Sequence, residues 1–198
     1  MIPDPRRIKS FKNAAAFERW LETRHDREPE LWIKIHKRAS GLASVTPAQA
    51  LDVVLCWGWI DGLRKGFDDR SFLQRYTPRG KKSRWSQINR DHVARLVAAG
   101  RMTPAGQRQI DAAKADGRWE AAYAPMRDAT PATVPVDLRA AIAANARARR
   151  MFATLDKQNL FALAFRMGAV KTPAGRAKKI AALVATLARG ETVIRSRR

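Results

Sequence analysis

The sequence predicts an α+β fold: a small antiparallel sheet of about three strands with helices in the N-terminal half, followed by a helical C-terminal half. Three observations lead to this prediction. Residues 31–36 alternate between apolar and polar side chains, and a basic stretch at 59–77 has hairpin character. After Pro78 the apolar residues recur at helical spacing. A stretch rich in Pro and Thr at residues 125–137 then separates the mixed part from a purely helical end.

Helical and extended segments alternate through the first part of the chain. Residues 10–25 predict a helix, because their large apolar side chains share one face at helical spacing. Residues 31–36 follow a period of two and predict a half-buried strand. Thr46 and Pro47 then supply an N-cap and a first-turn proline, which together predict a helix start. Gly58 is well placed to end that helix in the left-handed conformation that favours glycine.

A hairpin and a series of helices are expected next. Residues 59–67 and 71–77 are short apolar and basic runs, and residues 68–70 supply a plausible turn between them. Farther along, the tetrapeptide Thr-Pro-Ala-Gly occurs at 103–106 and again at 172–175. We interpret it as a repeated signal for a helix start and not as a domain repeat.

The chain is expected to have three parts. Residues 1–124 form the α+β domain, which carries the Gly-Trp-Ile-Asp-Gly corner and the basic hairpin. Residues 125–137 are expected to be a linker. Residues 138–198 are expected to form a helical segment packed on or beside the first domain.

The charge of the chain is unusual. Its 198 residues include 39 Lys and Arg against 18 Asp and Glu, which gives a formal net charge of +21. Such a balance favours a polyanionic partner, such as nucleic acid, an anionic membrane surface or a phosphorylated ligand. A second interpretation is that helix surfaces filled with Ala and Arg produce the charge without any selected partner.

A single cysteine, Cys56, excludes an internal disulfide and indicates a reducing compartment. Residues 1–20 contain no apolar core of signal-peptide length, and no run of about 18 uncharged apolar residues occurs in the chain. We therefore expect no transmembrane segment and a cytoplasmic location. The sequence identifies no protein partner.

Signatures of metal sites and nucleophiles are missing from the sequence. His25, His36 and His92 are isolated and belong to no metal-ligand motif. Cys56 lies near the end of an apolar helix and is expected to be a buried hydrophobic residue, because no base accompanies it. The chain has no G-x-S-x-G, P-loop or G-x-G-x-x-G motif. We therefore expect no metal, no cofactor and no catalytic residues, and a function that is not enzymatic.

The strongest candidate for a binding site is the basic segment that follows the hairpin. Ser83 is expected to cap a helix that begins near Arg84, and a helix N-terminus surrounded by cations can hold a phosphate or a carboxylate. A carboxylate from the Gly-Trp-Ile-Asp-Gly corner would orient this cluster, and two tryptophans would wall it. The alternatives are a basic loop that only caps a helix, and tryptophans that only close the core. The predicted ligand-binding residues are Asp61, Arg79, Lys81, Lys82, Ser83, Arg84, Trp59 and Trp85.

Four segments carry a resemblance to a known family. The chain has Gly-Trp-Ile-Asp-Gly at 58–62, a Thr-Pro-Arg segment with Ser and Trp-Ser at 77–86, and Gly-Arg-Met-Thr-Pro-Ala-Gly at 100–106. The stretch at 112–123 matches too. These motifs resemble the YdeI/OmpD-associated, or bacteriocin-protection, family over nearly the whole chain. The chain departs from the family pattern at 174–176, where Ala-Gly-Arg replaces an acidic motif. The resemblance implies a link to tolerance of bacteriocins or antimicrobial peptides, and it implies no agreed reaction, cofactor or catalytic residue.

Three functions therefore remain open. The first is a non-enzymatic protein that binds a small anionic ligand at the basic segment. The second is a nucleic-acid-binding protein, since residues 147–198 carry thirteen Lys and Arg against two acidic residues. The third is an enzyme that acts on a small anionic substrate with Asp61 as general base.

Overall fold

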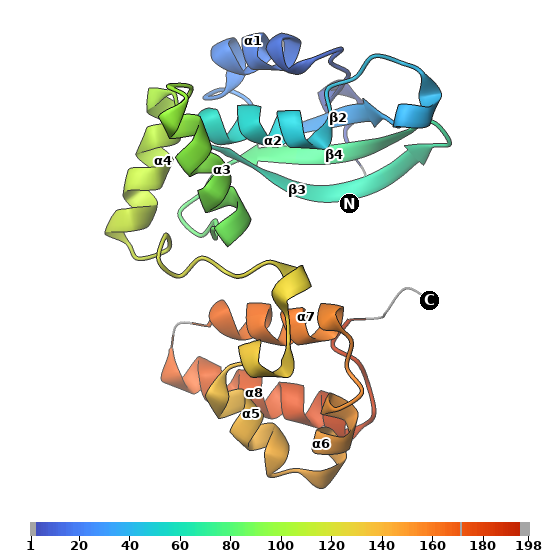
Figure 1. Cartoon of the computed structure of the whole chain (residues 1–198), viewed down its shortest axis with the longest axis vertical. Coiled ribbons are helices and arrows are strands. Elements are labelled where there is room, and N and C mark those ends of the chain that lie inside the picture. Colours follow the sequence, from blue (N-terminus) through green and yellow to red (C-terminus); the bar gives the residue numbers. More distant parts are fainter. Residues whose placement is uncertain (1–2, 171, 195–198) are drawn as a thin grey trace. The chain divides into compact units, whose positions relative to one another are not determined.

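The computed structural model describes residues 3–170 and 172–194, and their mixed α+β architecture confirms the predicted fold class (Figure 1). The chain divides into two compact units. The first, here called the sheet unit, comprises Met1–Trp85 and Asn89–Glu120. The second, here called the helical unit, comprises Ser86–Ile88 and Ala121–Arg198.

The sheet unit contains a four-stranded sheet in the order β1-β2-β4-β3. The predicted hairpin is present as β3 and β4, and both the β2–β4 and β3–β4 pairs are antiparallel. Strand β1 pairs in parallel with β2 and was not predicted, because two residues are too few to show a periodicity. The strands are β1 (Ile8–Lys9), β2 (Leu31–His36), β3 (Trp59–Asp68) and β4 (Ser71–Pro78).

Two helices cover one face of this sheet (Figure 1). Helix α1 (Ala14–Arg24) begins at Asn13, whose side chain accepts a hydrogen bond from the backbone N–H of Ala16. Helix α2 (Pro47–Cys56) begins at Thr46 with a capping box that Gln49 completes. Both start signals act within one turn of helix, and the one at Thr46 was predicted from the sequence.

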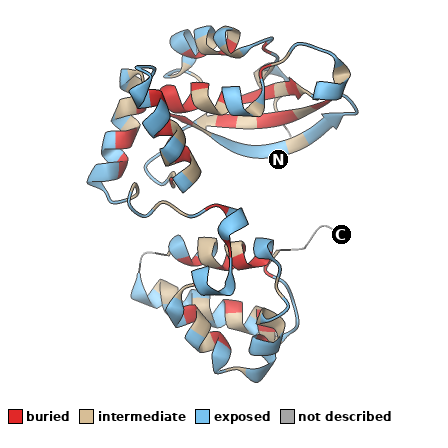
Figure 2. Ribbon diagram, in the orientation of Figure 1, coloured by how far each residue is buried: buried red, intermediate tan, exposed pale blue. Residues whose placement is uncertain are grey.

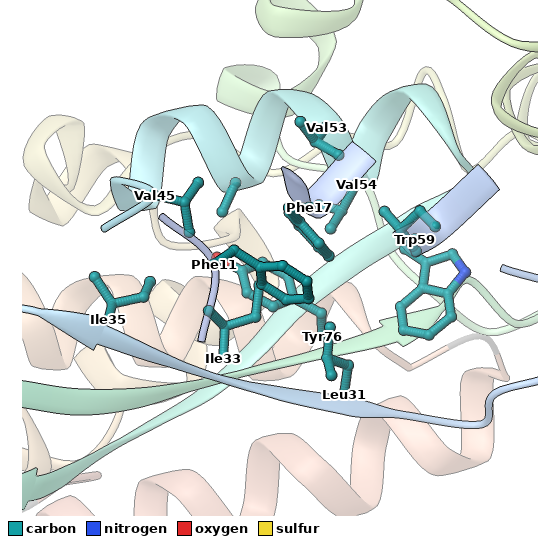
Figure 3. Packing of buried hydrophobic residues seen from close by; sticks show 12 residues of the cluster. Phe11, Phe17, Leu31, Ile33, Ile35, Val45, Val53, Val54, Trp59 and Tyr76 are labelled. Atoms are coloured by element: carbon teal, nitrogen blue, oxygen red, sulfur yellow. The ribbon is translucent and has the colours of Figure 1, made fainter. Parts of the chain in front are cut away.

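The core of the sheet unit lies between these helices and the sheet (Figure 3). Leu31, Ile33 and Ile35 point into it from β2, as their alternation predicted, and each is at most 1% exposed. Trp32, in the alternate set, is fully buried as well, so the strand is more buried than the predicted half-buried one. Strand β3 is at the edge of the sheet and is exposed over most of its length (Figure 2). The polar residues that follow the Gly-Trp-Ile-Asp-Gly corner therefore lie beside an open sheet edge.

Helix α3 (Gln87–Ala98) begins three residues later than predicted. Helix α4 (Pro104–Ala115) begins at Thr103, as the first Thr-Pro-Ala-Gly motif predicted. The hydroxyl of Thr103 donates to the carbonyl oxygen of Cys56 at 2.6 Å, which fixes the start of α4 against the end of α2.

The helical unit has its own core. Its four α-helices bury a continuous set of apolar side chains, among them Leu138, Leu163 and Leu187, each fully buried. Residues 125–137, expected as a linker, contain two short 3-10 helices, η3 (Met126–Asp128) and η4 (Pro131–Thr133). The helices are α5 (Val136–Ala143), α6 (Ala146–Phe152), α7 (Lys157–Gly168) and α8 (Pro173–Ala188). No helix in the described part of the chain is long and apolar enough to cross a membrane.

Candidate functional site

The predicted binding segment forms a tight turn and not the start of a helix. The backbone N–H of Ser83 donates to the carbonyl oxygen of Gly80 at 2.9 Å, and the Ser83 hydroxyl accepts a hydrogen bond from the Gly80 N–H at 3.0 Å. The hydroxyl therefore closes the turn. The prediction that Ser83 caps a helix beginning near Arg84 is wrong, because α3 begins only at Gln87.

Two neighbouring lysines occupy the tip of this turn. Lys81 and Lys82 are both exposed, and neither has an ion pair or a side-chain hydrogen bond within the part of the chain that the structure describes. Residues 79–84 are here called the basic turn. Its exposed positive charge is available to an anion from solution, although no helix terminus contributes to it.

Arg79, the first residue of the basic turn, is buried and holds the turn in place. It is 5% exposed, and its guanidinium carbon lies 3.5 Å from the ring centroid of Trp85, which is itself 1% exposed. Arg79 Nη1 donates to the carbonyl oxygen of Arg84 at 3.2 Å, across the turn. The backbone N–H of Arg79 donates to the carbonyl oxygen of Gly58 at 2.9 Å. The corner at residues 58–62 and the basic turn are thus joined through Arg79.

A second tryptophan, contributed by the segment after α4, extends this cluster. The rings of Trp85 and Trp119 meet edge to face with centroids 4.9 Å apart. Arg90 and Lys114 lie 5.1 Å and 5.7 Å from the Trp119 ring. Arg118 Nη1 donates to the carbonyl oxygen of Ser83 at 2.9 Å, so this segment also holds the turn.

Sequence reasoning missed the contribution of residues 114–119 to the site. The stretch Lys-Ala-Asp-Gly-Arg-Trp combines two cations with an aromatic residue, which is the signal that was available. Its distance of about thirty residues from the basic turn gave no reason to place the two together.

Asp61 lies in β3 directly opposite Tyr76 of β4. The residue is exposed, yet the surrounding protein partly desolvates its carboxylate and raises its pKa. A hydrogen bond from its own backbone N–H opposes that rise, and so do the positive charges of Arg79 and Arg64. Asp61 is therefore within the electrostatic reach of Arg79, and the structure gives it no hydrogen bond to Ser83 or Trp85.

Trp59 lies in the core of the sheet unit (Figure 3). It is 1% exposed, and its indole N–H donates to the carbonyl oxygen of His25 at 2.9 Å. This placement corrects its predicted role and that of Trp85, which is also 1% exposed, since a ring without exposed area has no surface to offer as the wall of a ligand site. The reason for Trp59 is its position, one residue after Gly58, where β3 is still covered by α2.

His92 is less isolated than the sequence indicated. Its Nδ1 lies 2.7 Å from a carboxylate oxygen of Asp52, which also accepts a hydrogen bond from Arg95 at 2.6 Å. Burial alone would raise the pKa of Asp52, but these two hydrogen bonds lower it. The cluster joins α2 to α3. The described residues contain no group of three or more His, Cys, Asp or Glu side chains that could hold a metal ion.

Cys56 is fully buried, as predicted. Burial raises the pKa of its thiol to about 11, so the thiol is protonated at neutral pH and unreactive as a nucleophile.

Comparison with known proteins gives a family match in each part of the chain. Residues 9–109, just over half of the chain, match the family described as a domain of unknown function (DUF8412). Residues 131–190 match the family described as bacteriocin-protection, YdeI or OmpD-associated, which supports the resemblance drawn from the sequence. The segments quoted for that resemblance nevertheless lie outside residues 131–190, and all but the one at 112–123 lie within residues 9–109. No curated protein and no solved structure matches the chain.

Proposed function

This chain belongs to the family described as a domain of unknown function (DUF8412), and we propose that it binds a small anionic ligand at its basic turn without catalysing a reaction. The observation that carries the proposal is the pair of exposed lysines, Lys81 and Lys82, on a turn that is closed by hydrogen bonds.

Rigidity supports a binding role for these lysines. The turn is closed by two hydrogen bonds between Gly80 and Ser83, and Arg118 holds it from the segment after α4. Beneath it lies the buried stack of Arg79 on Trp85. Because the backbone of the turn is held, only the two lysine side chains lose conformational entropy when an anion binds. A phosphate or carboxylate group is the chemistry that suits it.

The test is calorimetric titration of the protein with inorganic pyrophosphate. The double substitution Lys81→Ala and Lys82→Ala is expected to weaken binding by about tenfold or more, because it removes two charge-assisted hydrogen bonds. Lys178→Ala with Lys179→Ala is the matched control, since these two lysines are also adjacent and exposed. Equal losses in both double variants would refute a local site.

Nucleic-acid binding is the second candidate, favoured by the occurrence of basic surface in both units. Besides the basic turn, helix α6 presents exposed arginines at positions 147, 149 and 150. A nucleic-acid binder would lose affinity for labelled single-stranded DNA or RNA in both double-lysine variants. Each lost phosphate contact would also lower the slope of log affinity against log salt by about one.

A protective role against bacteriocins is proposed only as an indirect one. The family that matches residues 131–190 is described by that role. A chain with a net charge of +21 repels cationic peptides, so direct capture of such peptides is disfavoured. We propose that any protection follows from the binding of an anionic ligand.

A further inference from the structure

A pocket of about 650 Å³ opens on the helical unit, between α6 and the end of α8. It is shallow and largely open to solvent. Every residue that lines it belongs to the helical unit. The lining residues used below are Arg147, Arg150, Met151, Leu187, Ala188 and Arg189.

The rim of the pocket is cationic. Arg147 and Arg150 are three residues apart on α6 and therefore share one side of that helix. Both are exposed, and neither has an ion pair or side-chain hydrogen bond within residues 3–170 and 172–194. Arg189 completes the rim and is held by two hydrogen bonds to Glu191, at 2.9 and 2.8 Å. No acidic residue lines the pocket. An anionic group at this rim would gain two unneutralised guanidinium groups.

The inner surface of the pocket is apolar. Met151 and Ala188 are partly exposed there, and they pack on Leu187, which belongs to the core and has no exposed surface of its own. An inorganic anion would leave this surface in contact with water, whereas an alkyl or aromatic group would cover it. Methionine at such a place adapts to apolar ligands of different shapes.

We propose that this pocket binds an amphiphilic anion, in which a phosphate or carboxylate head group meets Arg147 and Arg150 and an apolar body lies against Met151 and Ala188. The site is separate from the basic turn and goes beyond the proposed function. A lipid head group and a free small molecule share this chemistry.

The experiment is titration of the whole protein with octyl phosphate, with inorganic phosphate and 1-octanol as partial probes. Octyl phosphate is expected to bind with saturation, and at least about tenfold more tightly than either partial probe. Arg150→Ala is expected to weaken it about tenfold. The matched control is Arg149→Ala, because Arg149 is exposed on the same helix but does not line the pocket.

Two results would overturn the proposal: octyl phosphate that binds no better than inorganic phosphate, or equal losses in Arg149→Ala and Arg150→Ala. Vesicles of phosphatidylcholine with and without phosphatidic acid form a second arm. Vesicle binding that requires both phosphatidic acid and Arg150 supports the proposal and identifies the ligand as a lipid. Binding of octyl phosphate that depends on Arg150, without vesicle binding, supports the proposal and identifies the ligand as a soluble molecule. The Arg150-dependent part of octyl phosphate binding should persist when the basic turn's lysines are replaced, so failure here and failure of the proposed function are distinguishable.

Discussion

Asp61 and Asp68, at opposite ends of β3, have pKa values shifted in opposite directions. Desolvation raises the pKa of Asp61, and the charges of Arg79 and Arg64 only partly offset it. A hydrogen bond from Ser71, together with those from Lys34 and the backbone of Arg70, lowers the pKa of Asp68 from 3.8 to about 2. One strand thus carries a carboxylate that favours the folded state when ionised and another that disfavours it.

We expect Asp61→Asn and Asp68→Asn to change the melting temperature at neutral pH in opposite directions. Because the folded pKa of Asp61 is raised, its contribution to stability is lost as the pH rises through that pKa, so Asp61→Asn should raise the melting temperature. Because the folded pKa of Asp68 is lowered, its contribution is lost as the pH falls from 3.8 towards about 2, so Asp68→Asn should lower the melting temperature.

The measurement is thermal unfolding of each variant across a range of pH. Both differences from the wild type should shrink as the solution becomes acidic, because both carboxylates are then protonated. Asp69→Asn removes the same charge from the exposed turn of the same hairpin and serves as the control. A melting temperature for Asp61→Asn that falls below that of the control would contradict the desolvation of Asp61.

At the scale of the elements, the contact between the end of α2 and the start of α4, here called the joint, explains why two sequence motifs contain a glycine. Gly58 has a φ of +73° just after α2, as its predicted place at the helix end requires. A Cβ atom on Gly58 would meet the carbonyl oxygen of Ala105 at 2.8 Å. A Cβ atom on Gly106 would overlap the backbone of Cys56. Each motif therefore needs its glycine because the other motif's backbone lies against it.

We expect Gly106→Ala to destabilise the protein much more than Gly175→Ala, although both glycines end a Thr-Pro-Ala-Gly motif. The first substitution meets backbone atoms of Cys56 that cannot move independently of α2 and should cost about 1–3 kcal/mol or more. The second meets only the side chains of Thr172 and Val170, at 2.8 and 3.2 Å. Both gain the same helix propensity from alanine.

Denaturant titration of the two variants measures this difference in the free energy of unfolding. Equal costs would mean that the glycine in this motif serves the helix start and not the joint. Gly80→Ala has open space around its new Cβ atom and provides a reference for a substitution without a clash.

At the scale of the whole molecule, the net charge of +21 acts on stability as well as on binding. Like charges repel one another most strongly in the compact folded state, and salt screens that repulsion. We expect the melting temperature to rise as sodium chloride is increased from low to physiological ionic strength, with potassium chloride giving the same rise. A melting temperature that falls over this range would mean that the ion pairs outweigh the repulsion.

The sequence by itself determined the features that depend on neighbouring residues. The helix starts at Thr46, Thr103 and Thr172 were predicted because each cap bonds to a backbone N–H three residues later. The strand at 31–36 was predicted because alternate residues of a strand face opposite sides. The excess of positive charge is likewise fixed by composition alone.

Only the tertiary structure decided which distant residues meet. It brought Trp119 against Trp85, placed Trp59 in the core, and committed the Ser83 hydroxyl to a turn. The arginine-lined pocket exists because α6 lies beside the end of α8. These contacts depend on the free energy of packing the whole chain, and no spacing within a short segment records them.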